Sequence, residues 1–478
     1  MKVFIVESPG KVKKIQGFLG SGYKVMASVG HIRDLPEKDM GVEPPQFKPK
    51  YVVTKPDVVK KLKEAVKGAT HVYLATDPDR EGESIAWHLA EALRLDRPHR
   101  VTYTEITEAA VKNALLKTRE IDLNLVAAQE GRRVLDRQVG YMVSPALSGQ
   151  IGDKVSAGRV QSPAVRLVVE RERAIREFSV TNHFGVELVF AAGAGDTTPW
   201  KAVWLPKQGG WLAEDQEFVL DEEAAKKVAA VKPVTVRDCR NSKSTSAPPA
   251  PFTTSTLQQA ASAALKINPA TCMSLAQSLY EGGHITYMRT DSPNLSDEAI
   301  AAIRAWASRN GHKTPPLPRK WPAKESAQEA HEAIRPTHIE VETAGNTEDE
   351  KALYALIRLR AIVSQLVDAE FAVRTLTLVG DADGREVVFE AKGKTLAVPG
   401  WRALVAKDQT DESEDEEECV VPELLVGASL SDYEGKVVAK KTKPPARYTE
   451  AALVRELEKR GIGRPSTYAS ILDNIIKR

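Results

Sequence analysis

The sequence predicts a multidomain protein that joins an α/β part, helical parts and a β-rich part. Three features of its 478 residues indicate this class. Short apolar strands alternate with helices as far as residue 118, an almost wholly helical stretch follows at 119–177, and strands with polar turns begin near residue 178. A helical block at 250–368 interrupts those strands. A chain of this length is expected to form about three domains.

The first part of the chain alternates strands and helices, which predicts a mostly parallel sheet. Residues 2–6 form the first strand, the turn after it carries Glu7 and Lys11, and a helix is expected over 12–19. The later elements of this part follow in the same order: a strand over 25–30, a proline-rich loop excursion within 37–60, a helix over 57–68, a strand over 101–103 and a helix over 107–118 that a threonine caps.

An ATP-binding P-loop is the obvious alternative for the first turn. Gly17 and Gly22 have the separation that this motif requires. Tyr23 and Lys24 then follow in place of the Lys-Ser or Lys-Thr pair. The sequence therefore predicts no use of ATP.

An acidic turn follows the strand expected over 71–75 and precedes a helix over 84–93. Ligands bind at the carboxyl ends of strands in open α/β sheets. The turn holds four acids, Asp77, Asp79, Glu81 and Glu83. Carboxylates this close repel one another unless a cation neutralises them, and Mg²⁺ binds one or two carboxylates together with phosphate. The alternative is a solvated helix start, where acids are also favoured; Gly82 and the preceding strand favour the metal site.

The stretch 119–177 is rich in arginine, and its loop 156–162 leads into a helix. A helix N-terminus with nearby arginine and serine is suited to phosphate. The alternative is a surface laced with ion pairs, given Glu170 and Glu172. The arginines concerned are Arg132, Arg133, Arg137, Arg159 and Arg166.

The β-rich part surrounds the helical block. Its expected strands are 184–191, 198–205, a short one at Val219, 373–380, 386–391 and 395–398. The acidic segment 407–418 is expected to be a disordered loop. The basic run 436–447 suits either a phosphate backbone or ordinary surface.

Composition limits the class of protein. The net charge is only +2, so any basic surface must be local. The cysteines lack the spacing of a zinc site or a disulfide framework: Cys239, Cys272 and Cys419. The first apolar run is too short for a signal peptide, and no later run is long enough to cross a bilayer. A soluble cytoplasmic protein is expected.

A tyrosine in the helical block is the candidate nucleophile. By itself Tyr287 resembles an ordinary packed residue. Arg289 lies two positions further on and shares its side if the segment is extended. A phenol with its ordinary pKa of about 10 is a poor nucleophile unless a nearby cation makes its deprotonation easier. His331 ends an expected helix before a proline, either as a capping residue or as a phosphate contact.

Seven motifs together resemble the type IA DNA topoisomerases, and more closely the bacterial topoisomerase I branch than the decatenating topoisomerase III branch. The resemblance covers essentially the whole chain. The motifs are residues 7–11 (Glu-Ser-Pro-Gly-Lys), 30–36 (Gly-His-Ile-Arg-Asp-Leu-Pro), 77–83 (Asp-Pro-Asp-Arg-Glu-Gly-Glu), 156–162 (Ser-Ala-Gly-Arg-Val-Gln-Ser), 285–292 (Ile-Thr-Tyr-Met-Arg-Thr-Asp-Ser), 331–337 (His-Glu-Ala-Ile-Arg-Pro-Thr) and 463–468 (Gly-Arg-Pro-Ser-Thr-Tyr).

The resemblance implies a torus built from a TOPRIM α/β domain, helical domains and a β-rich arch. It divides the chain into a TOPRIM metal-binding domain at 1–36 and 61–118, a helical DNA-binding domain at 37–60, 119–177 and 431–478, an arch at 178–249 and 369–430, and a helical lid at 250–368 that carries the nucleophile.

The resemblance also implies an activity and residue roles. Such enzymes cut one DNA strand through a 5′-phosphotyrosine, pass the other strand, reseal the break without ATP and so relax negative supercoils. Tyr287 is the implied nucleophile, with Arg289, Lys11 and Glu81 as further catalytic residues. Mg²⁺, for which Mn²⁺ could substitute, is held by Glu7, Asp77 and Asp79. The implied DNA-binding positions are His31, Arg133, Arg137, Ser156, Ala157, Gly158, Arg159, Val160, Gln161, Arg289, His331 and Thr467.

The implied partner is a single-stranded region of negatively supercoiled DNA. The protein is expected to act as a monomer that associates with the nucleoid and does not bind a membrane. Family members generally continue past the last motif into zinc modules, which this chain lacks. The chain is therefore expected to be a fragment of a longer protein. We expect it to cleave single-stranded DNA but to relax plasmids weakly. Two alternatives stay open: another TOPRIM-type DNA phosphotransferase or nuclease, and a DNA-binding clamp without turnover.

Overall fold

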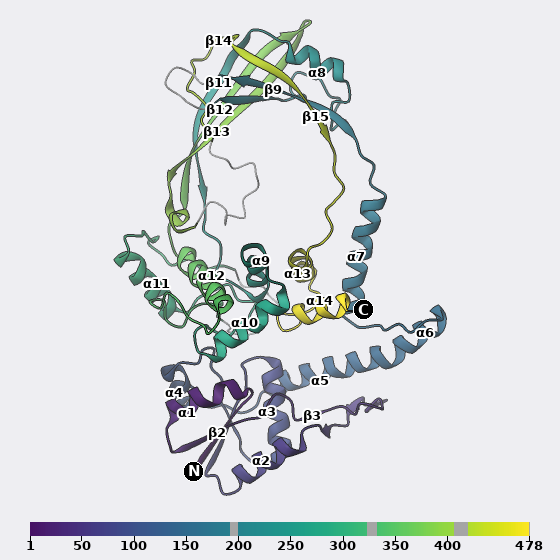
Figure 1. The fold of residues 1–478 in the computed structure, drawn as a ribbon, viewed down its shortest axis with the longest axis vertical. Helices are drawn as coiled ribbons and strands as arrows, with labels where there is room; N and C mark the ends of the chain where they lie inside the picture. Colours follow the sequence, from purple (N-terminus) through teal and green to yellow (C-terminus); the bar gives the residue numbers. More distant parts are fainter. Residues whose placement is uncertain (192–198, 323–331, 406–418, 478) are drawn as a thin grey trace.

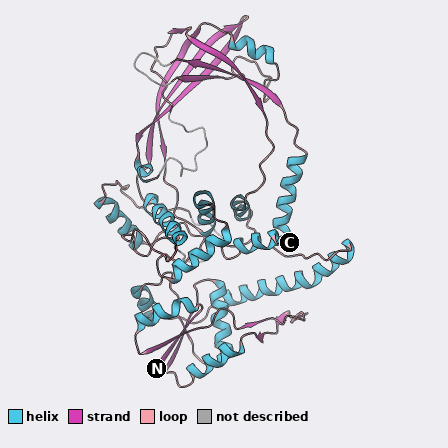
Figure 2. Cartoon of the chain, in the orientation of Figure 1, coloured by secondary structure: helices cyan, strands magenta, loops and turns pink. Residues whose placement is uncertain are grey.

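The chain forms an open ring that stands on a compact α/β base (Figures 1 and 2). The computed structural model describes residues 1–191, 199–322, 332–405 and 419–477. A curved sheet makes the top of the ring, helices make its lower side, and the base lies below them, with α5 (Leu123–Gln138) projecting away from it as a helical arm. No helix in these described ranges combines the length and the apolar character needed to span a bilayer.

The base contains a four-stranded parallel sheet in the order β2-β1-β7-β8. Its strands are β1 (Lys2–Val6), β2 (Tyr23–Ala27), β7 (His71–Ala75) and β8 (His99–Arg100). Its helices are η1 (Pro9–Lys11), α1 (Val12–Leu19), α2 (Pro56–Val66), α3 (Arg80–Leu93) and α4 (Glu108–Leu116). The predicted α/β class is confirmed, although the last strand ends before the predicted residues 101–103.

Strand β1 divides its side chains between two cores, because successive residues point to opposite faces of a sheet. Val3 and Ile5 pack with α2 and α3. Phe4 and Val6 pack into a second core that also contains Tyr287 from the helical block. The base and the helical block therefore share apolar packing.

The segment 37–60 was expected to be a loop, but three of its short stretches are strands of two antiparallel ribbons. These pair β3 (Arg33–Asp34) with β6 (Val52–Val53) and β4 (Val42–Glu43) with β5 (Lys48–Pro49). The segment packs along the helical arm: the Tyr51 hydroxyl donates to Glu130 over 3.0 Å, and the Tyr141 hydroxyl donates to the Glu37 carbonyl over 2.7 Å.

The arginine-rich stretch is helical, as predicted. It comprises α5 (Leu123–Gln138), a π-helical turn (Val139–Val143), α6 (Ser144–Ile151) and α7 (Gln161–Arg176). Near the end of the chain, α13 (Glu450–Lys459) and α14 (Tyr468–Ile476) pack against α7 through Ala164, Leu167 and Val454.

The top of the ring is a seven-stranded antiparallel sheet in the order β14-β11-β12-β13-β10-β9-β15. Its strands are β9 (Asn182–Phe190), β10 (Trp200–Trp204), β11 (Val234–Ser246), β12 (Ala369–Ala382), β13 (Arg385–Val398), β14 (Ser429–Leu430) and β15 (Tyr433–Lys441), with α8 (Glu222–Ala229) beside them. The three short strands expected after residue 372 are two long ones, and Val219 lies buried in a loop. The acidic segment 407–418 and Thr198 lie outside the described residues.

The helical block contains α9 (Thr254–Leu265), α10 (Pro269–Glu281), α11 (Asp297–Arg309) and α12 (Glu348–Ser364), and the short η3 (Gly400–Leu404) follows it after β13. The helix expected before Pro336 is not formed at residues 332–335. Ile334 instead bridges to Phe252, and Pro336 bridges to Ile285. These bridges hold the segment that carries Tyr287.

Candidate active site

The acidic edge forms where β1 and β7 end side by side. Val6 pairs with Ala75 in the parallel register, so Glu7 and Asp77 follow neighbouring strand ends. Asp79 is the N-cap of α3, and its Oδ1 accepts from the Gly82 amide over 2.8 Å. The local structure therefore orders both aspartates at the carboxyl edge of the sheet, where the sequence predicted a site.

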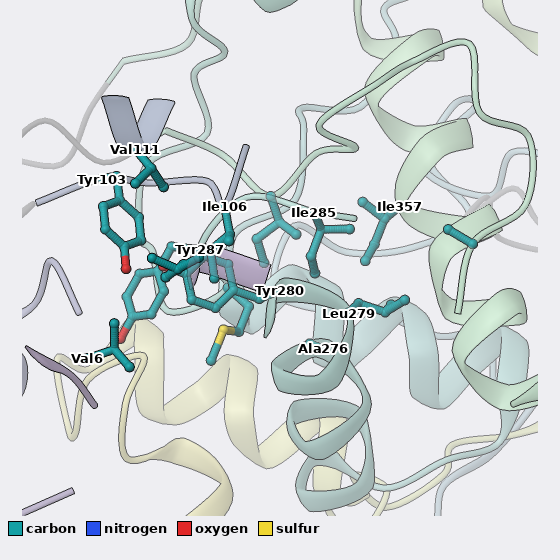
Figure 3. Close-up of a cluster of buried hydrophobic side chains, with 14 of the residues drawn as sticks. Val6, Tyr103, Ile106, Val111, Ala276, Leu279, Tyr280, Ile285, Tyr287 and Ile357 are labelled. Atoms are coloured by element: carbon teal, nitrogen blue, oxygen red, sulfur yellow. The ribbon is translucent and has the colours of Figure 1, made fainter. Parts of the chain in front are cut away.

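Tyr287 reaches this edge from the helical block. Its backbone N–H donates to the Thr104 carbonyl over 2.7 Å, and its hydroxyl donates to Asp79 Oδ2 over 2.7 Å. The side chain is only 2 % exposed, and its ring packs against Tyr280 at 5.2 Å between centroids. Tyr103, Tyr280 and Tyr287 lie together in Figure 3. The expected nucleophile and the expected acidic pocket are thus in direct contact.

The charges around Tyr287 oppose one another. Burial and the Asp79 and Asp77 carboxylates raise the pKa of Tyr287 well above its ordinary value, while Arg289 acts in the opposite direction. One Arg289 nitrogen lies 3.9 Å from Asp79 Oδ2. Burial alone would lower the pKa of Arg289, but Tyr287 and the carboxylates hold it above the usual range. The phenol is therefore protonated here, beside a permanent cation.

Lys11 lies inside the same edge. Its ammonium is fully buried, forms an ion pair with Asp77 and lies 4.9 Å from the centroid of the Tyr280 ring. A buried lysine needs such partners to remain charged. The sequence identified Lys11, but it gave no signal for Tyr280.

The metal-binding prediction can be compared with the donor set. Burial and the Asp77 and Asp79 carboxylates raise the pKa of Glu7 to about 7, an anionic crowding that a cation would relieve. Within the described ranges, no three Asp, Glu, His or Cys side chains converge closely enough to hold one ion. The expected three-carboxylate cage is therefore not assembled. The oxygen-only donor set still fits Mg²⁺, because two carboxylates with phosphate and water suffice.

The four acids of the turn have different partners. Glu81 Oε1 lies 2.7 Å from His31 Nε2, a contact that holds the pKa of Glu81 below its usual value. Glu83 is buried and bonds to Arg100 and Arg119. The expectation of one cluster shared around a cation is thus wrong for Glu83, whose charge two arginines already neutralise.

The two arginines of α5 that were expected to bind DNA are bonded to other side chains of the protein. Arg133 binds Asp34 through two hydrogen bonds of 2.9 and 2.6 Å. Arg137 donates to the Tyr141 hydroxyl over 2.9 Å and lies over its ring. Neither lines the pocket at the acidic edge.

The loop expected to bind phosphate joins α6 to α7. Ala157 and Gly158 donate their amides to the hydroxyls of Ser144 and Ser162, at 2.9 and 3.1 Å. Ser156 and Val160 lie in the same loop, and Gln161 begins α7. Arg166 instead forms an exposed ion pair with Glu170, as the surface alternative predicted.

A pocket of about 340 Å³ connects this loop with the acidic edge. Arg159, held to Asp136 over 2.9 Å, lines it. The structure thus brings six expected site residues to one pocket from distant segments: Asp79, Glu81, Arg159, Val160, Arg289 and Thr467. Arg132 and Arg464 line it too. Arg132 belongs to the arginine-rich stretch that the sequence singled out, whereas Arg464 was missed, although it lies in the 463–468 motif. His331 lies outside the described residues.

The buried side chain of His88 makes the stability of the α/β base depend on pH. It packs against Tyr51 at 4.5 Å and Trp87 at 4.8 Å between ring centroids. Burial, aided by the charge of Arg33, lowers the pKa of His88 from 6.5 to about 3, so the folded protein keeps it neutral. The unfolded chain takes up a proton below pH 6.5, and stability is therefore lost as the pH falls from there towards 3.

Between pH 7 and pH 5 we expect the wild type to lose about 2 kcal/mol more unfolding free energy than His88→Gln, at about 1.4 kcal/mol per pKa unit. Urea denaturation at both pH values measures this difference. Equal losses in the two proteins would contradict the buried neutral histidine.

Comparisons with known proteins agree with this geometry. A family model described as DNA topoisomerase matches residues 120–478, and the Toprim domain model matches residues 2–108. A plasmid DNA topoisomerase I of Xylella fastidiosa is 54 % identical over 485 residues, covering 100 % of this chain and 73 % of that protein. DNA topoisomerase 1 of Streptomyces coelicolor is 44 % identical over 100 % of this chain and 55 % of its own length. DNA topoisomerase 1 of Escherichia coli is 42 % identical over 99 % of this chain and 58 % of its own length.

The fold also matches a solved structure. Full-length topoisomerase I from Thermotoga maritima superposes with a TM-score of 0.85 at 35 % identity, over 99 % of this chain and 78 % of that one. Several of the relatives extend well beyond this chain, which spans little more than half of their length.

Proposed function

Because this chain belongs to the bacterial DNA topoisomerase I family, we propose that it is an ATP-independent type IA topoisomerase that uses Tyr287 as its nucleophile. It breaks one DNA strand, passes another strand through the gap and rejoins the first, which relaxes negative supercoils. The observation that carries this proposal is the 2.7 Å hydrogen bond between the Tyr287 hydroxyl and Asp79, at the carboxyl edge of the sheet.

The proposed cleavage exchanges one phosphoester for another. A bond forms between the Tyr287 oxygen and the scissile phosphorus, the bond from phosphorus to the 3′-oxygen breaks, and the departing 3′-oxygen takes up a proton from water to become a hydroxyl. Asp79 is positioned to accept the phenolic proton, since it already accepts that hydrogen bond. The phosphotyrosine preserves the energy of the broken bond, so the 3′-hydroxyl can reverse the reaction without ATP.

Lys11 and Arg289 supply the positive charge that phosphoryl transfer needs. Both are held beside aspartates of the acidic edge, in the ion pair with Asp77 and at 3.9 Å from Asp79. Glu7, Asp77 and Asp79 are the residues that would hold Mg²⁺, which supplies charge neutralisation at phosphate when bound. Glu81 is proposed to act indirectly, by orienting His31.

The proposed substrate is a single-stranded region of negatively supercoiled DNA. The pocket lined by Arg159, Arg289 and Thr467 supports a path for the strand towards Tyr287. Arg133, Arg137, the loop 156–161 and His331 are proposed as further contacts. We propose that the protein acts as a monomer in the cytoplasm, associated with the nucleoid.

The domain boundaries are proposed as the motifs imply them. Segment 37–60 is grouped with the helical DNA-binding part because its Tyr51 and Glu37 contact the helical arm. The lid, at 250–368, carries Tyr287, and the segments 178–249 and 369–430 form the arch.

A denaturing gel tests this function. Labelled single-stranded oligonucleotide is incubated with the protein, quenched with denaturant and examined for a band of protein linked to DNA. We expect the band with the full chain. A TOPRIM-type nuclease would give shortened DNA without linkage, and a binding clamp would give neither product; either result would refute the proposal.

Metal removal separates breakage from rejoining. We expect chelation with EDTA to leave the covalent band and to prevent its reversal by high salt, because the metal's proposed role is to hold the cleaved ends for resealing. Restoring Mg²⁺ should return intact oligonucleotide. Equal reversal with and without the metal would disprove this role.

A further inference from the structure

Glu83 is the acid of the turn that the proposed chemistry does not use, and it is buried. Only 1 % of its surface is exposed. Its carboxylate accepts from Arg100 Nε at 2.9 Å, from both terminal nitrogens of Arg119 at 2.7 and 2.8 Å, and from the Asp122 amide at 2.7 Å. Burial alone would raise the pKa of Glu83, but the two guanidinium groups hold it below its usual value. Glu83 is thus a buried junction, a carboxylate that two arginines and one backbone amide hold in place.

Arg100 occupies the other side of this junction and is fully buried. Besides Glu83, the acceptors of its guanidinium among the described residues are backbone carbonyls near the ends of two strands. The acceptors are Thr76 at 2.8 Å, Asp77 at 2.7 Å, Val101 at 2.7 Å and Leu74 at 3.2 Å. A planar guanidinium can satisfy several acceptors at fixed angles, whereas a lysine ammonium cannot reproduce that fork. Arg100 therefore fixes the backbone that bears the Asp77 carboxylate.

The turn leaves little room for adjustment around Asp77. A Cβ atom on Gly82 would lie 2.1 Å from the Asp77 carbonyl oxygen, so the first turn of α3 lies directly against that carbonyl. The Asp77 carbonyl is therefore held between Gly82 and Arg100. A change in either would move the carboxylates of Asp77 and Asp79 relative to Glu7.

The junction also reaches the helical arm. Asp122, whose amide bonds Glu83, is the N-cap of α5, and the Ser84 hydroxyl donates to Gln129 of the same helix over 3.1 Å. Arg119 lies in the linker between the base and α5. One carboxylate thus connects the acidic turn with the start of the helix that lines the pocket.

We propose that Glu83 and Arg100 are positioning residues that set the Asp77–Asp79 turn for metal binding and keep it in register with α5. This inference rests on the proposed function for the role of the metal. Stability alone does not require such a network, because buried ion pairs can often be replaced by apolar residues without loss. Partners behind metal ligands, in contrast, typically change metal affinity 10–100-fold when they are altered.

Arg100→Lys tests the inference, since it keeps the charge and loses the fork. Mn²⁺ binding to the DNA-free protein is measured by electron paramagnetic resonance, together with hydrogen exchange at the Gly82 amide. We expect Mn²⁺ binding to weaken about 10–100-fold and exchange at Gly82 to quicken. Arg447→Lys is the matched control, because Arg447 also makes two hydrogen bonds to a glutamate, Glu172, but on an exposed surface. It should bind Mn²⁺ as the wild type does.

Wild-type Mn²⁺ affinity in Arg100→Lys would overturn the inference. If that variant does not fold, Arg119→Lys decides the question, since Arg119 is 39 % exposed and approaches Glu83 from outside. It should weaken Mn²⁺ binding several-fold, and unchanged binding would overturn the inference. Absence of Mn²⁺ binding in the wild type would overturn it too, while leaving covalent attachment through Tyr287 unaffected.

Discussion

Replacing Tyr287 with phenylalanine is expected to remove the covalent protein–DNA band entirely. The substitution deletes only the hydroxyl that contacts Asp79, so no oxygen remains to bond the scissile phosphorus. The ring and its packing against Tyr280 are retained, and we expect oligonucleotide affinity to stay within about tenfold of the wild type, because one hydroxyl group contributes at most about 1.5 kcal/mol through a hydrogen bond. The quenched-gel assay and a binding titration on the same preparation measure both quantities.

Tyr280→Phe is the matched control. Tyr280 is equally buried in the same aromatic group, and its hydroxyl has no hydrogen-bond partner among the described residues. We expect this variant to form the covalent band at the wild-type level and to unfold at slightly higher temperature, since an unsatisfied buried hydroxyl costs about 1–3 kcal/mol. A band that persists in Tyr287→Phe but disappears in Tyr280→Phe would reassign the nucleophile.

Local patterns predicted the base well. The expected strands 2–6 and 71–75 and the helix 12–19 have the observed bounds, because short apolar runs and a 3.6-residue period are read directly from neighbouring residues. The lengths of β12 and β13 were underestimated. Exposed charged residues outside the predicted strands, such as Asp381 and Lys392, belong to β12 and β13, because long-range pairing between the two strands extends the ladder past the apolar stretches.

The ribbons within 37–60 were missed for a similar reason. Each strand has only two residues, too few to show an alternating pattern, and β3 pairs with β6 rather than with the next strand along the chain. Proline-rich composition indicated only an irregular excursion. The contact with α5 that orders the segment, from Tyr51 to Glu130, is a tertiary feature that local composition does not encode.

The site was predictable in its chemistry more than in its geometry. Residue spacing placed Asp77 and Asp79 at a strand end, but Tyr287 follows Asp79 by 208 residues, and only the motif resemblance joined them. The sequence could not predict that the four acids of the turn have different partners. Arg100 and Arg119 neutralise Glu83, whereas Glu81 contacts His31, and neither arginine belongs to a recognisable motif.

Arg289→Gln is expected to slow cleavage about 100- to 1,000-fold, the typical cost of removing one preorganised charge from a transition state. The guanidinium lies 3.9 Å from Asp79, too far for a hydrogen bond, so its effect on the site is electrostatic. It also opposes the rise in the pKa of Tyr287 that burial and the aspartates cause. Glutamine removes both contributions and leaves the segment's backbone intact. Single-turnover cleavage of an oligonucleotide measures the rate.

Arg289→Lys separates charge from shape. If the electrostatic argument is correct, lysine should recover part of the lost rate, because it restores the charge without the planar fork that suits phosphate. Arg309→Gln controls for the loss of an arginine elsewhere in the helical block, because Arg309 pairs with Glu340 on an exposed surface. This variant should cleave DNA at the wild-type rate. Equal rates for the wild type and Arg289→Gln would mean that Lys11 alone supplies the positive charge, and the contribution assigned to Arg289 would be wrong.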